Sequence, residues 1–180
     1  MVDRGLAIFI GIIVLVLYLV AAIYLKVKPK MIAIYCVFIA YLTAVVAITL
    51  FPITYDSYSN IQYDGGLTWY NFIPFKTINE MISGGFGVSD ATQIFGNILL
   101  GLPFGVFVLF FLRKPKWWVL ILLAFSLTVA IEMSQMIVGF AIGNMYRNVD
   151  IDDIILNSFG TFLGYGVYKL LPSKIKEIWK

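Results

Sequence analysis

Long apolar runs, separated by short polar segments, make up most of the chain. The five longest cover residues 5–25, 31–51, 94–112, 117–137 and 154–171. Each is close to the roughly 20 residues that an α-helix needs to cross about 30 Å of hydrocarbon. Backbone groups in lipid must hydrogen-bond within their own segment, so helices are the expected spanning elements. The pattern predicts an all-α integral membrane protein with five transmembrane helices, built as a single domain over residues 1–180.

The one long connection, residues 52–92, lies between the second and third runs. Its later part, NFIPFKTINEMISGGFG, is apolar and aromatic, and Phe75, Ile78 and Ile82 recur at helical spacing ahead of Gly84. This pattern predicts a short amphipathic helix that lies at the membrane interface or enters it as a re-entrant turn. A plain surface helix packed on the other helices is the alternative.

Composition supports a membrane protein and narrows the chemistry. Hydrophobic residues make up 61% of the chain and charged residues only 13%, whereas soluble domains carry about 25% charged residues. The chain has no histidine, so the commonest metal ligand and proton shuttle is missing. Its single cysteine, Cys36, can form no internal disulfide. We expect no cofactor and no nucleic-acid partner.

The basic residues predict the orientation of the helices. Ten of the thirteen lie in three segments, KVKPK after the first run, RKPK after the third, and the C-terminal end. Five crossings place these three segments on one face, which the positive-inside rule makes cytoplasmic. The N-terminus is then outside and the C-terminus is cytoplasmic. Nine of the ten acidic residues fall on the outer face, all except Glu177.

Polar residues inside the apolar runs are the candidates for chemistry. Glu132 shares a helix face with Thr128 and Gln135, and a carboxylate inside a membrane needs a polar partner or a wet cavity. The most plausible partner of Glu132 is Arg147. In the third run Asn97 shares a face with Gly101 and Gly105, and in the last run Asp153 and Asn157 share one with Gly160 and Gly164. Glycines four residues apart predict close helix packing.

In the predicted topology these polar residues all fall at one depth, at or just below the outer surface. We therefore expect one outward-facing ligand-binding site, made of Asn71, Asn97, Glu132, Gln135, Arg147, Asp150, Asp153 and Asn157. Each residue also has a plainer explanation. Asp150, Asp152 and Asp153 could only cap a helix start, and Glu132 could only form a structural ion pair. Arg147 could anchor to lipid headgroups, and Asn97 or Asn157 could only join helices. Of the acidic residues, Asp152 is the one we expect to do no more than start its helix.

Four segments together resemble the VanZ-like family of bacterial membrane proteins. They are NFIPF (71–75), FGNILLGLPFGV (95–106), SLTVAIEMSQ (126–135) and RNVDIDDIILNSFGTFLGYG (147–166). The matching positions include Asn71, Pro74, Phe75, Asn97, Pro103, Gly105, Glu132, Gln135, Arg147, Asp150, Asp153, Asn157 and Gly160. Order and spacing both agree with the family pattern, over about half of the chain.

The resemblance implies a multi-pass protein of the bacterial cell membrane that lowers susceptibility to teicoplanin, a lipid-tailed glycopeptide. The expected partners are membrane lipids, a lipid-tailed glycopeptide or a lipid-linked cell-wall precursor. A protein that binds amphiphiles without hydrolysing them is the first hypothesis. The alternatives are a metal-dependent enzyme acting on lipid-linked phosphates, with Asp150, Asp152 and Asp153 as metal ligands, and a small lipid transporter. The missing histidine argues against the enzyme, and the apolar inner halves of the helices argue against the transporter.

Overall fold

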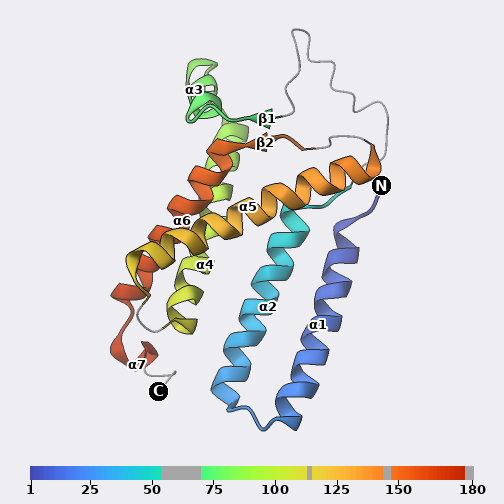
Figure 1. Ribbon diagram of the computed structural model, residues 1–180, viewed down its shortest axis with the longest axis vertical. Helices are drawn as coiled ribbons and strands as arrows, with labels where there is room; N and C mark the ends of the chain where they lie inside the picture. Colours follow the sequence, from blue (N-terminus) through green and yellow to red (C-terminus); the bar gives the residue numbers. More distant parts are fainter. Residues whose placement is uncertain (54–69, 113–114, 144–146, 177–180) are drawn as a thin grey trace. The chain divides into compact units, whose positions relative to one another are not determined.

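The computed structural model describes residues 1–53, 70–112, 115–143 and 147–176. The chain forms two compact units, Met1–Tyr55 with Pro172–Lys180, and Asp56–Leu171. Figure 1 labels the helices and strands of both units. A single domain over the whole chain stays a prediction.

The first unit is a helical hairpin of α1 (Arg4–Tyr24) and α2 (Pro29–Thr49), together with the short α7 (Ser173–Lys176). Gly11 lets the two long helices approach closely, because a Cβ atom there would lie 2.3 Å from the Thr43 side chain. At the open end of the hairpin, Val2 and Ile53 form an antiparallel bridge. Beside it Ala7, Ala47 and Phe51 make a small buried core.

The second unit contains most of the polar segments. Its elements are β1 (Tyr70–Asn71), α3 (Lys76–Ser83), α4 (Val88–Phe111), α5 (Trp117–Ile142), β2 (Val149–Asp150) and α6 (Ile151–Leu170). The two-residue strands pair in parallel, which the sequence pattern did not predict. The predicted short helix is confirmed as α3, which ends at Gly84. Its depth relative to a membrane stays a prediction.

Two helices of this unit are longer than their apolar runs. α4 begins at Val88 because the backbone N–H of Gly87 is bonded to the Asp90 carboxylate at 2.8 Å, which caps the helix ahead of the apolar residues. α5 continues to Ile142 and ends at Gly143, whose φ of 70° suits a residue without a side chain. The predicted start of α4 was about two turns too late, and the predicted end of α5 was about one turn too early. An apolar run marks only the residues that suit lipid, whereas the capping residues determine where a helix begins and ends.

Four helices in the described part of the chain, α1, α2, α4 and α5, are long and apolar enough to cross a membrane. Their apolar side chains are widely exposed: Leu17 of α1 is 64% exposed, and only Ala7 and Ala22 of that helix are buried. Such a surface is typical of lipid contact. The chain is therefore a helical membrane protein. α6 is not among the four, because Asp152, Asp153 and Lys169 make it less apolar, so five crossings are not supported by length and composition.

Direct backbone contact joins α4 to α6, the most extensive pairing of helices in the second unit (Figure 1). Glycines form this seam: Gly101 and Gly105 of α4 face Gly160 and Gly164 of α6. A Cβ atom on any of the four would lie 1.9–2.0 Å from a backbone oxygen of the facing helix. The Thr161 hydroxyl also donates to the Gly101 carbonyl at 3.3 Å. The two glycine pairs predicted to pack closely therefore pack against each other.

The seam also sets the direction and register of the two helices. Gly101 of α4 lies against Asn157 of α6. Four residues further along both helices, Gly105 lies against Thr161. α4 and α6 therefore run parallel, with α5 between them in sequence. In this register α6 lies alongside the apolar part of α4, from about Phe95 onward, and both helices begin their contact at the same end of the unit.

Replacing Gly160 with alanine should lower the melting temperature of the purified protein in detergent. The new methyl group would meet the Ile98 carbonyl at 2.0 Å, and overpacking of this kind costs about 1–3 kcal/mol. Gly96→Ala in α4 and Gly166→Ala in α6 are matched controls because nothing lies within 4 Å of a Cβ atom at either position. These controls should keep or slightly raise the melting temperature, since alanine favours helix more than glycine does. Equal melting temperatures for Gly160→Ala and the controls would contradict the seam.

Candidate functional site at the start of α6

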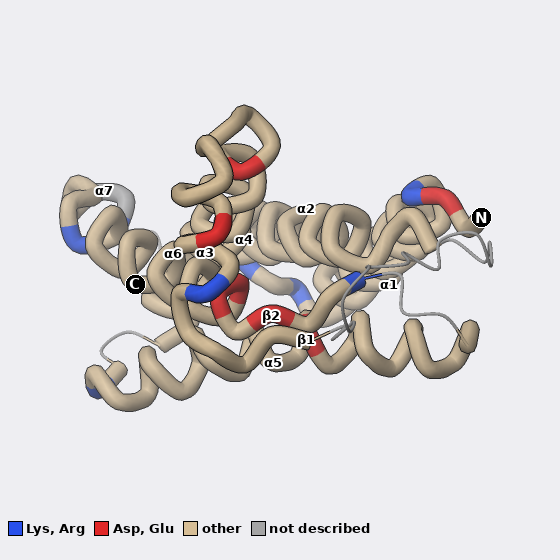
Figure 2. Tube along the Cα trace, turned by 90° about the horizontal axis from the view of Figure 1, so that it is seen from above, with Lys and Arg blue, Asp and Glu red and all other residues tan. Residues whose placement is uncertain are grey.

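Four acidic residues of the second unit, Glu132, Asp150, Asp152 and Asp153, have their contacts around the start of α6. Figure 2 shows acidic positions where β2 leads into α6, beside α3. The parallel pairing of β1 with β2 puts Asn71 opposite Asp150. Two sequence segments 79 residues apart are thereby joined at the first turn of the helix.

Asp150 is a buried junction between three elements. Its carboxylate caps α6 by accepting the backbone N–H of Asp152 at 2.8 Å. It also accepts the Asn71 side-chain amide at 3.0 Å and the Thr77 hydroxyl at 2.5 Å. The capping explanation of Asp150 is therefore correct, and capping is only one of its contacts. A carboxylate that is 7% exposed needs such donors to offset its lost hydration.

Asp152 caps a different helix from its own. Its two carboxylate oxygens accept the backbone N–H groups of Phe75 at 2.5 Å and Ile78 at 3.1 Å, which belong to the first turn of α3. No α3 side chain does this, because Phe75 occupies the cap position and has no acceptor. The expectation that Asp152 only starts α6 was wrong. Its side chain is 1% exposed and ties α3 to α6.

Asp153 faces α4. The Asn97 side-chain amide donates to its carboxylate, and Gln93, one turn earlier on α4, hydrogen-bonds the same group. This contact continues the glycine seam toward the start of both helices. The structure thus brings together Asn97 and Asp153, which the sequence analysis placed at one depth.

Glu132 belongs to the buried face of α5, together with Thr128 and Gln135. It is 5% exposed, and its carboxylate accepts the backbone N–H of Asp150 at 3.4 Å. Arg147, the partner predicted from the sequence, is near enough for its positive charge to act on Glu132, but so are the acidic groups of Asp150 and Asp153. A specific Glu132–Arg147 pair stays a prediction.

A comparison with sequence models of protein families identifies the family of the chain. The sequence model of the family described as VanZ/LLP1 matches residues 38–172, which is about three quarters of the chain. The chain belongs to the VanZ/LLP1 family. The resemblance drawn from four short segments is confirmed, and the match also takes in the second half of α2. Neither the curated proteins nor the solved structures that were searched gave a match.

In this VanZ/LLP1 protein, Asn157 is a buried side chain with an unused hydrogen-bond acceptor. It is 2% exposed, and its Oδ1 atom accepts no hydrogen bond within the described part of the chain. An unsatisfied polar group in a protein interior costs about 1–3 kcal/mol. Asn157 lies one turn beyond Asp153 on the face of α6 that meets α4. The seam alone does not explain why this position carries a polar side chain.

The acidic residues show no arrangement that favours a metal. Within residues 1–53, 70–112, 115–143 and 147–176, no three or more His, Cys, Asp or Glu side chains are placed to hold one. The proposed ligands Asp150, Asp152 and Asp153 each accept hydrogen bonds from protein groups instead. The metal-dependent enzyme thus gains no support from the geometry.

Sequence reasoning missed two features of this VanZ/LLP1 site. Thr77, whose hydroxyl donates to Asp150, was counted only as part of a short helix. Asn71 and Thr77 both donate to the Asp150 carboxylate. Their spacing of six residues is only a weak signal of such a shared partner in the sequence. The remote capping by Asp152 had no local signal, since its N–H partners lie 74 and 77 residues earlier in the chain.

The substitution Asp152→Ala should loosen α3 without unfolding the unit. Loss of a helix cap costs about 0.5–2 kcal/mol, and here it would leave two N–H groups of α3 without their acceptor. We expect faster amide hydrogen exchange across residues 75–83, measured by mass spectrometry. Asp90→Ala is the matched control, because Asp90 caps α4 from within and its loss should speed exchange only near Gly87. Unchanged exchange in α3 would contradict the remote cap.

Proposed function

We propose that this VanZ/LLP1 protein binds the polar head of a membrane amphiphile at the outer surface of the bacterial cell membrane. The binding site would lie where α4, α5 and α6 meet, and would include Glu132, Gln135, Arg147, Asp153 and Asn157. In this proposal Asn71, Asp150 and Asp152 hold the site together, because their side chains are already engaged by protein donors.

The observation that carries the proposal is the pair of buried, poorly satisfied acceptors. Glu132 has one hydrogen bond within the described residues, and that bond is long, at 3.4 Å. Asn157 Oδ1 has none there. A carboxylate within a membrane helix costs about 3 kcal/mol on insertion scales, so a sequence without a use for Glu132 would favour an apolar residue. A headgroup with hydroxyl or ammonium donors would satisfy both acceptors.

The site has chemistry for a headgroup of mixed charge. The carboxyl groups of Glu132 and Asp153 can meet an ammonium group, and Arg147 offers a planar set of donors that suits a phosphate or carboxylate. Teicoplanin carries an acyl chain that anchors it at the outer membrane surface, where such a site would lie. We therefore propose that binding here lowers susceptibility to teicoplanin, as the family resemblance implies.

For the topology we propose five crossings, with the N-terminus outside and the C-terminus in the cytoplasm. The parallel register of α4 and α6 supports α6 as the fifth, because a helix that lies along the apolar part of α4 would share its depth in the bilayer. A crossing by α5 in the opposite direction would connect them, because α5 follows α4 and precedes α6 in the sequence. The clustering of basic residues supports the orientation.

The protein would be expressed in a host that is susceptible to teicoplanin. Cells with the Glu132→Gln variant should be as susceptible to teicoplanin as cells without the protein. The amide keeps the size of the side chain and removes its capacity to ionise. Arg147→Ala should have the same direction of effect. Minimal inhibitory concentrations and membrane abundance would be measured together. Ser134→Ala is the control, because within the described residues this α5 hydroxyl donates to its own helix, at the Ala130 carbonyl.

Wild-type susceptibility in Glu132→Gln and Arg147→Ala, at wild-type abundance, would remove the proposed role of the site. Release of phosphate from a lipid-linked substrate, dependent on a divalent metal and lost in Asp153→Ala, would favour the enzyme instead. Movement of a labelled lipid across proteoliposomes would favour the transporter.

Cysteine labelling should test the orientation directly. In a Cys36→Ala background, a cysteine at Ser89 near the start of α4 should react with a membrane-impermeant maleimide added to intact cells, because we place this end outside. A cysteine at Lys116, at the start of α5, should react only after the membrane is opened. The reverse pattern would overturn the orientation and leave the helices unchanged.

A further inference from the structure

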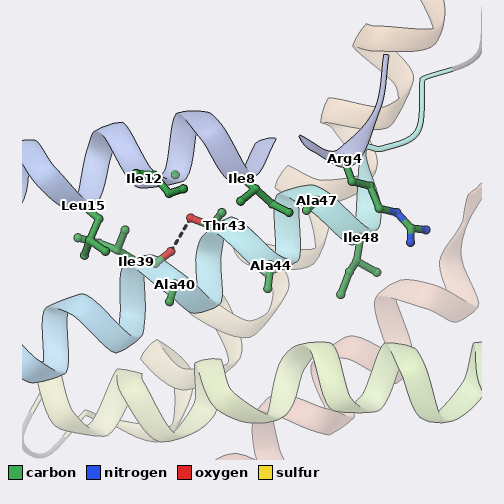
Figure 3. A pocket seen from close by; sticks show the side chains of 11 residues that line it. Arg4, Ile8, Ile12, Leu15, Ile39, Ala40, Thr43, Ala44, Ala47 and Ile48 are labelled. Carbon is green, nitrogen blue, oxygen red and sulfur yellow. Dashed lines mark hydrogen bonds between the residues drawn. The ribbon is translucent and has the colours of Figure 1, made fainter. Parts of the chain in front are cut away.

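A second site lies in the first unit, in a groove between α1 and α2 that the proposed function does not use. The groove has a volume of about 430 Å³. Ile8, Ile12 and Leu15 of α1 form one wall (Figure 3). Ala40, Ala44 and Ala47 of α2 line the other side, where their short side chains leave space. Gly11 and Thr43 hold the helices close between them.

The groove offers no hydrogen bond along its apolar length. The Thr43 hydroxyl donates to the Ile39 carbonyl of its own helix at 2.8 Å, as the dashed line in Figure 3 shows. Its remaining lining is aliphatic, apart from one residue, Arg4. A chain of methylene groups is the ligand that such walls fit.

Arg4 stands at one end of the groove, at the start of α1. Its Nε atom donates to the Phe51 carbonyl at 3.5 Å, a long contact. Within the described part of the chain its other guanidinium donors have no partner, and no carboxylate pairs with its charge. An arginine at the end of a membrane helix reaches the headgroup layer, where its planar donors match a phosphate.

The length of the groove matches one leaflet of a bilayer. An α-helix rises about 16 Å between Arg4 and Leu15, which is about half of the roughly 30 Å of hydrocarbon. A lipid with its phosphate at Arg4 would therefore place its chain along the groove as far as the midplane. This agreement between charge, length and lining holds whichever way the hairpin is oriented.

We propose that the groove between α1 and α2 holds one acyl chain of a bilayer phospholipid, with the lipid phosphate bound by Arg4. The site is separate from the cluster at the start of α6, and it requires only that α1 and α2 cross the membrane. An anionic phospholipid fits best, because Arg4 supplies a positive charge that no carboxylate of the described residues pairs with.

The test is retention of phosphatidylglycerol by the full-length protein. The protein would be purified from nanodiscs of phosphatidylcholine with a minor share of phosphatidylglycerol, washed in mild detergent and weighed by native mass spectrometry. We expect one phosphatidylglycerol per chain in the wild type. Arg4→Gln should reduce retention about tenfold, because a hydrogen bond to a charged group is lost. Arg4→Lys should keep part of it.

Two further variants separate the groove from general lipid contact. Ala44→Phe would fill the groove and should abolish retention, and Ala40→Phe provides the same test should the first variant fold poorly. Ala33→Phe adds the same bulk to α2 at an exposed position that does not line the groove, and it should retain lipid as the wild type does.

Four outcomes would overturn the proposal. The wild type could retain no lipid, or Ala44→Phe could retain as much as Ala33→Phe. A polyprenyl-linked species could be found in place of the phospholipid. A lipid-free dimer that Ala44→Phe dissociates would show that a second copy of the chain fills the groove. None of these results bears on teicoplanin susceptibility or Glu132, so this proposal and the proposed function can fail separately.

Discussion

Backbone contact between α4 and α6 is the constraint on which the second unit depends. At four glycines no side chain stands between the helices, and backbone oxygens of the facing helix occupy the space where the Cβ atoms of these residues would otherwise lie. In lipid, helices gain little from burying apolar surface against each other, so close packing and hydrogen bonds must hold them together. The register that the glycines set also places Asn97 beside Asp153.

The acidic residues at the start of α6 divide into two groups by what their oxygens contact. Asp150 and Asp152 accept hydrogen bonds from backbone and side-chain donors of β1, α3 and α6, and thereby tie a two-residue strand and a short helix to the start of α6. Such short elements have little stability of their own. Asp150 and Asp152 therefore stabilise the fold, while Glu132 and Asn157 are buried acceptors that the described residues leave with unused capacity. Buried groups of this second kind are the ones that a ligand can satisfy.

Several features of the candidate site could be predicted from sequence because their signals are local. Asp153 and Asn157 share a helix face with two glycines, and that periodicity predicted both the packing seam and its polar end. The predicted site residues Asn71 and Asp150 do meet, but the strand pairing that brings them together has no local signal, since two residues are too few for a pattern. Thr77 and the cap provided by Asp152 were missed for the same reason: their partners lie more than 70 residues away.

The sequence by itself determined the class of this protein, the approximate positions of its helices and its family. Apolar run length and residue spacing are properties of one segment at a time, and lipid imposes them on each segment separately. Only the tertiary structure decided that α4 and α6 run parallel, that Asp152 caps α3, and that Asn157 has an acceptor that no donor of the described residues meets. These features depend on contacts between groups that are far apart in the sequence. The contact between α4 and α6 forms because their glycines let the two backbones touch.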